Sequence, residues 1–156
     1  MNNQIQAIIT NLQEVLEGDP WYGRSVYALL SEVNPSLAHA RTANNQHSLA
    51  DLLYHMLTWA AFTLAAVQGK SAAEVRAFEA LDWRELHHLE HTWDKGLAAF
   101  KETHRQLIDL LKTKDDSLLD QMVPARRYNY RYLLNGLVQH NIYHVGQVAY
   151  RVKELA

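Results

Sequence analysis

Residues 133–148 read LLNGLVQHNIYHVGQV, and this stretch decides how the fold is interpreted. Apolar residues that recur every three or four positions mark one face of an amphipathic helix. In this stretch that face consists of Leu133, Leu137, His140, His144 and Val148. The pattern predicts a helix over about residues 129–154 and assigns both histidines to its inward side.

Helical spacing extends over most of the remaining chain. Long helices are predicted over residues 5–16, 48–68 and about 83–112, with shorter ones at 24–32 and after the capping-box pattern of Ser71 and Glu74. The prolines at positions 20, 35 and 124 all lie outside the long helices, as expected from their missing N–H. The sequence therefore predicts an all-α fold, a four-helix bundle that forms a single domain over residues 1–156.

The composition excludes several classes of function. The 156 residues include no cysteine, which excludes disulfides, thiolate-bound zinc, iron–sulfur clusters and a cysteine nucleophile. The 15 basic and 17 acidic residues give a net charge of −2, which disfavours a nucleic-acid-binding surface. The longest apolar stretch, residues 59–67, is too short to span a bilayer, and no signal peptide is apparent. We therefore expect a cytoplasmic protein.

Nine histidines are the unusual feature of this composition. His140 and His144 are four positions apart, so their side chains share one helix face. Each unsatisfied buried polar group costs about 1–3 kcal/mol, and a shared metal ion would satisfy both rings. His55 lies on the inward side of the 48–68 helix, beside Leu52 and Met56. We predict that His55, His140 and His144 form a metal site with open coordination positions, which is typical of catalytic sites.

Other interpretations of the histidines stay open. The pair at positions 140 and 144 can be incidental, with each ring hydrogen-bonded locally. His87 and His91 form a rival pair, and Glu85 with His88 gives one Glu-x-x-His unit, but a di-iron bundle needs two such units. The charged surroundings of this cluster favour a solvated face. Three further histidines, His39, His47 and His104, have no partner at metal-ligand spacing, and we expect them at the surface or locally hydrogen-bonded. His47 could also reach the site from its loop.

Two glycines flank the histidine pair inside the last predicted helix. Gly136 and Gly146 each cost about 0.8–1 kcal/mol relative to alanine at an interior helix position. They permit either the tight packing of a neighbouring helix or the close approach of a ligand. Both interpretations fit the sequence.

Residues 136–147, GLVQHNIYHVGQ, resemble the signature of the DinB/YfiT-like superfamily. Residues 47–56, HSLADLLYHM, are similar to the second-helix motif of that family, and residues 18–23, GDPWYG, also resemble it. The resemblance covers nearly the whole chain. It implies an up-down-down-up four-helix bundle, often dimeric, with a divalent metal held by His55, His140 and His144. Nickel, zinc, manganese and iron occur across such families. Nickel, copper and zinc all suit three imidazoles, so we expect nickel or zinc here, with manganese and iron as alternatives.

The family members with known activity resemble thiol-dependent S-transferases or isomerases. The resemblance therefore implies a metal-dependent transferase that joins a low-molecular-weight thiol to a small electrophile. Because the chain has no cysteine, that thiol must come from outside. Gln147 and Tyr143 could lie near the site, but no catalytic residue is assigned.

Two other functions remain possible at this point. One is a metal-dependent hydrolase, for which the sequence offers no evident general base. The other is a non-catalytic, metal-stabilised bundle that binds a ligand or acts in a stress response. The expected partners are a small-molecule substrate and a second copy of the chain, with no nucleic acid and no membrane.

Overall fold

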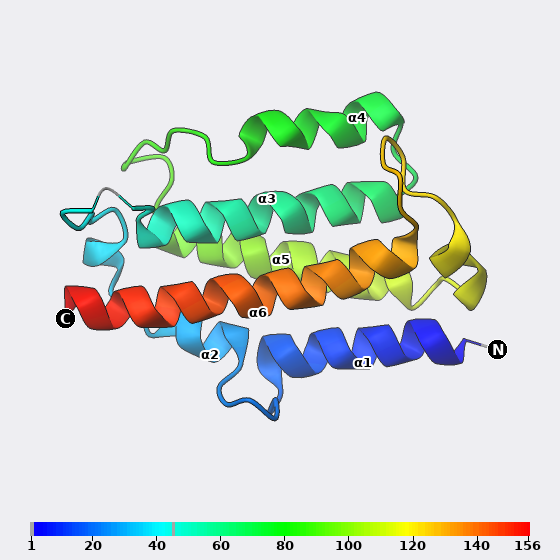
Figure 1. Ribbon diagram of the computed structural model, residues 1–156, viewed down its shortest axis with the longest axis horizontal. Coiled ribbons are helices and arrows are strands. Elements are labelled where there is room, and N and C mark those ends of the chain that lie inside the picture. The colour runs from blue at the N-terminus through cyan, green and yellow to red at the C-terminus, as the bar shows by residue number, and fades with distance from the viewer. Residues whose placement is uncertain (1, 45) are drawn as a thin grey trace.

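The computed structural model describes residues 2–44 and 46–156, and these residues form an all-α fold (Figure 1). The α-helices are α1 (Asn3–Glu17), α2 (Val26–Ser31), α3 (Leu49–Val67), α4 (Ala72–Arg76), α5 (Trp93–Leu111) and α6 (Tyr130–Leu155). The 3₁₀ helices are η1 (Pro35–Leu37), η2 (Ala77–Leu81) and η3 (Asp116–Asp120). The predicted all-α bundle is confirmed, and its long helices are α1, α3, α5 and α6.

α3 and α6 lie side by side and run in opposite directions (Figure 1). At the start of α6, the Tyr130 hydroxyl donates to the Ala66 carbonyl near the end of α3, at 2.6 Å. Near the end of α6, the Arg151 guanidinium donates to the His47 carbonyl just before α3, at 2.7 Å. This antiparallel pairing brings His55, in the first half of α3, level with His140 and His144, which lie near the middle of α6.

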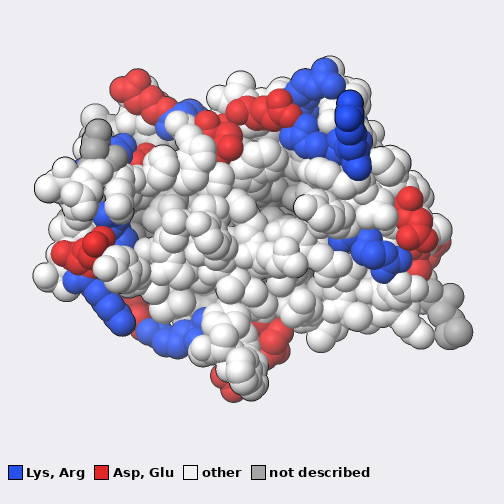
Figure 2. Space-filling view, viewed as in Figure 1, with Lys and Arg blue, Asp and Glu red and all other residues white. Residues whose placement is uncertain are grey.

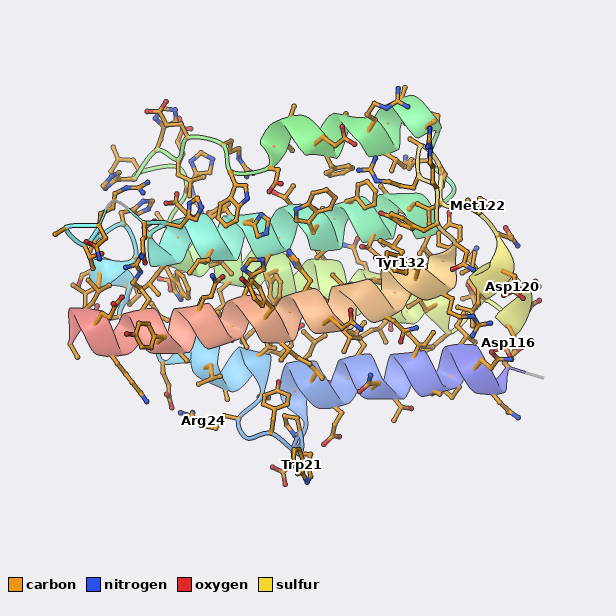
Figure 3. All side chains as sticks on the ribbon, viewed as in Figure 1. Trp21, Arg24, Asp116, Asp120, Met122 and Tyr132 are labelled. Carbon is orange, nitrogen blue, oxygen red and sulfur yellow. The ribbon has the colours of Figure 1, made fainter. Side chains whose placement is uncertain are left out.

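α5 packs against α3 in the same direction, because the starts of the two helices meet. The Tyr54 hydroxyl donates to the Thr92 carbonyl at 2.9 Å. Gly96 is required at this contact, since a Cβ there would lie 2.7 Å from the Tyr54 ring. α1 runs in the direction of α6, and its first turn is capped by Asp116, which accepts from the Ile5 N–H at 2.9 Å (Figures 1 and 3).

α3 is the central helix of the bundle. Its start is fixed by a capping box, in which the Ser48 hydroxyl accepts from the Asp51 N–H and the Asp51 carboxylate accepts from the Ser48 N–H. Fifteen of its 19 residues are buried. By length and composition α3 could cross a membrane, but 83% of its apolar window lies inside the protein. Such burial is that of a core helix.

The prediction of a continuous helix over residues 83–112 is wrong for its first part. α5 begins at Trp93, where the Thr92 hydroxyl accepts from the Lys95 N–H and Asp94 lies in the first turn. Residues 82–92 follow an irregular path, and Trp83 has a φ of 50°, which cannot continue a right-handed helix. The difference matters because this segment covers the predicted metal site.

Candidate metal centre

The three predicted ligands converge between α3 and α6. The Nε2 atom of His55 lies 3.0 Å from Nε2 of His144 and 3.0 Å from Nε2 of His140. His55 and His144 are buried, and His140 is half-buried. Within residues 2–44 and 46–156, this is the only group of His, Asp and Glu side chains placed closely enough to hold a metal ion. We call these three residues the histidine cluster.

Asp82 fixes the position of the proton on His55. Burial lowers the pKa of His55, and the Asp82 carboxylate offsets part of that shift, so the ring is neutral and has one N–H. The Oδ1 atom of Asp82 lies 2.5 Å from Nδ1 of His55, which therefore carries the hydrogen and donates to the carboxylate. The Nε2 atom of His55 is left with a free lone pair. A carboxylate behind a ligating histidine is a common outer partner in metal sites.

Gln147 has the same effect behind His144. Burial lowers the pKa of His144, and its Nδ1 atom donates to the side-chain oxygen of Gln147 at 2.6 Å. The Nε2 atom of His144 is therefore also unprotonated. The Nε2 atoms of His55 and His144 face each other at 3.0 Å with two lone pairs and no hydrogen between them. Such a contact is unfavourable unless a cation lies between the rings.

His140 completes the histidine cluster without an outer partner. Its Nδ1 atom is buried and has no hydrogen-bond partner among the described residues. Burial, reinforced by His144 and His55, lowers the pKa of His140 to about 3, so this ring is also neutral. Two nitrogens bound to one tetrahedral zinc ion at about 2.0–2.1 Å would lie about 3.3–3.4 Å apart. The two separations from His55 Nε2, 3.0 Å each, are close to that value, and all three ligand atoms lie within 4.8 Å of one another. The histidine cluster could therefore hold a divalent metal ion.

Comparison with known families agrees with this geometry. The sequence model of the DinB superfamily matches residues 23–148, most of the chain, and the match includes all three clustered histidines. The chain belongs to the DinB superfamily. A search of curated proteins finds no match. The family resemblance inferred from the two histidine motifs and residues 18–23 is thus confirmed.

In this DinB-superfamily chain, the segment before α5 covers the histidine cluster. The Trp83 indole stacks on the His55 ring with 3.8 Å between centroids, and His47 also stacks on Trp83, at 3.7 Å. The left-handed backbone of Trp83 costs about 1–3 kcal/mol, and the contacts of Asp82 and Trp83 with His55 hold it in place. Sequence reasoning missed both residues. The sequence signal that could have shown the true start of α5 was Thr92, the N-cap residue at which the irregular segment ends.

The other histidines of the DinB chain lie outside the cluster. His87 and His88 are exposed, as expected for a solvated face, and the His87 N–H donates to Nδ1 of His91 at 2.9 Å. His39 stacks on His88 with 4.2 Å between ring centroids. His104, expected at the surface or locally bonded, is fully buried, and its Nδ1 lies 2.9 Å from a carbonyl one turn earlier in α5.

Neither glycine of α6 serves tight helix packing, so that interpretation is wrong. Apart from the chain neighbours and the backbone of α6 itself, no described atom lies within 4 Å of a Cβ built at Gly136 or at Gly146. Gly146 borders a pocket of about 660 Å³ together with Tyr143 and Gln147, both of which were expected near the site. Gly136 borders a smaller cleft, of about 160 Å³, together with His140. Open space therefore flanks the histidine cluster on two sides.

Proposed function

We propose that His55, His140 and His144 bind a divalent metal ion, nickel or zinc, and that the protein is a metal-dependent thiol S-transferase. The metal is supported above all by the two unprotonated Nε2 atoms of His55 and His144, which face each other at 3.0 Å. Three protein ligands leave coordination positions open, as in catalytic metal sites. We expect a cytoplasmic homodimer that acts on a small-molecule electrophile.

The reaction would use an external thiol as its nucleophile. A divalent metal in the histidine cluster would lower the pKa of such a thiol and give a thiolate at neutral pH. Asp82 and Gln147 keep the N–H on Nδ1 of His55 and His144, which leaves each Nε2 free to bind. Trp83 covers the face of the His55 ring and limits the access of water there. The thiol proton would pass to solvent, and the thiolate sulfur would form a bond to the electrophilic carbon while the leaving group departs with the electron pair of the broken bond.

The transferase is tested by offering a panel of low-molecular-weight thiols, including cysteine and glutathione, with model electrophiles. Nickel- or zinc-loaded protein should conjugate at least one pair, and chelation or His144→Ala should abolish the reaction. His88→Ala is the matched control, because His88 is exposed and outside the cluster, and it should keep full activity. The transferase is contradicted if no thiol is conjugated in a metal-dependent manner.

A non-catalytic, metal-stabilised bundle is the second candidate. It is favoured by the location of the ligands, since His55 belongs to α3 and the other two to α6. A metal that joins two helices stabilises the folded state because it binds that state and not the unfolded chain. A large loss of thermal stability on chelation, with no turnover in the thiol panel, would support this candidate.

A further inference from the structure

A small, mainly apolar cleft adjoins the histidine cluster at His140. It lies between α3 and α6, has a volume of about 160 Å³, and is bordered by Trp59, Tyr128, Tyr132, Gly136, Leu137 and His140. Tyr132 lies on α6 at the side toward α3 (Figure 3). The surface over the middle of α3 and α6 carries few charged side chains (Figure 2). We call this space the His140 cleft.

Gly136 keeps the His140 cleft open. Inside a helix, a glycine costs about 0.8–1 kcal/mol relative to alanine. Apart from its chain neighbours and the backbone of its own helix, no described atom lies within 4 Å of a Cβ at this position, so packing against another helix does not explain the glycine. Because Gly136 has no side chain, it leaves space in the cleft. This space supports a ligand site independently of the aromatic residues that line the cleft.

The size and the walls of the His140 cleft define what it can hold. An apolar cavity of about 150 Å³ is large enough to bind benzene, so a cleft of about 160 Å³ accommodates one six-membered ring. The Tyr128 and Tyr132 rings lie 5.0 Å apart and are tilted by 43°, which presents aromatic surface to such a group. His140 is the member of the histidine cluster that borders the cleft, so a ring held there would lie directly beside the cluster.

We propose that the His140 cleft binds a single aromatic or similarly sized apolar ring of a small molecule. This inference rests on the proposed function in one respect, which is that the ring belongs to the electrophile and places its reactive carbon at the histidine cluster. Binding of the ring itself requires no turnover. The larger pocket beside Gly146, which is bordered by Gln147 and Arg151, lies outside this proposal and provides its control.

Binding of fluorobenzene to the full chain, measured by fluorine NMR with and without zinc, tests the proposal. The leucine of Gly136→Leu would extend over the preceding turn, toward Leu133 and Tyr132 and so into the cleft. It should weaken binding at least about tenfold, because the ring loses its contacts. The matched variant Gly146→Leu, also an open position in α6, should bind within about twofold of the wild type. Gly136→Ala, which fills less space, should give an intermediate loss.

Three results would overturn the assignment of the His140 cleft. The first is that the wild type does not bind fluorobenzene, and the second is that Gly136→Leu and Gly146→Leu weaken fluorobenzene binding equally. The third is that the wild type is a dimer which Gly136→Leu converts to a monomer, because a second copy of the chain would then cover the cleft. Aromatic-ring binding without any metal-dependent conjugation would leave the cleft assigned and contradict the transferase. Metal-dependent conjugation of an aromatic electrophile with an unchanged KM in Gly136→Leu would contradict the cleft alone.

Discussion

Removing the carboxylate behind His55 should weaken metal binding without unfolding the protein. Asp82 accepts from Nδ1 of His55 at 2.5 Å, and its side chain is 23% exposed, so its loss leaves no deeply buried charge unpaired. Loss of such an outer partner weakens metal binding about 10–100-fold, which corresponds to about 1.4–2.7 kcal/mol. Asp82→Ala removes both the acceptor and the charge, so it should weaken metal binding by about 100-fold. Asp82→Asn keeps an oxygen acceptor, so it should weaken metal binding by only about 10-fold.

The assay is the zinc dissociation constant, measured by competition with a chromophoric chelator at neutral pH. Gln147→Leu removes a neutral acceptor from His144 and should weaken zinc binding about as much as Asp82→Asn does. Glu85→Gln is the control, because it removes an exposed carboxylate from the same irregular segment and should leave zinc binding unchanged. A wild-type dissociation constant for a folded Asp82→Ala would refute the reasoning that Asp82 orients His55 as a ligand.

Further predictions concern stability. Alanine at Gly136 or Gly146 should raise the free energy of unfolding in urea by about 0.8–1 kcal/mol, since its methyl group meets open space. Alanine at Gly96 should lower it by about 1–3 kcal/mol because of overpacking, and equal effects at all three positions would contradict the packing argument. Burial lowers the pKa of His104 to about 4 from 6.5, so the unfolded chain binds more protons. The stability that His104 contributes is complete above pH 6.5 and is lost as the pH falls to 4, on the order of 3 kcal/mol. The metal-free double variant His104→Leu/Asn141→Leu should lose less stability over this range, and an unchanged acid loss would contradict the assignment.

The sequence predicted the helices and the histidine cluster because both depend on short-range regularities. Helical spacing placed His140 and His144 on one buried face, and the same rule placed His55 on the inward face of α3. The resemblance to the DinB family rested on these two stretches and on residues 18–23, and it is confirmed by the family match. Convergence of the three rings then required only that α3 and α6 pack together.

The residues that complete the site could not be predicted in this way. Asp82 reaches His55 across 27 positions of sequence, and Trp83 adopts a left-handed backbone that no local pattern indicates. The helix-forming residues that follow made the segment resemble the start of α5. The roles of the glycines also could not be predicted. The close approach of Tyr54 to Gly96 and the open space at Gly136 both depend on which helix lies opposite each glycine.

The central claim is that His55, His140 and His144 together hold one divalent metal ion. Elemental analysis of purified wild-type protein, His55→Ala, His140→Ala and the control His88→Ala tests it most directly. We predict about one metal ion per chain in the wild type and in His88→Ala, and little metal in the two cluster variants. Metal content that is unchanged in both cluster variants would contradict the claim.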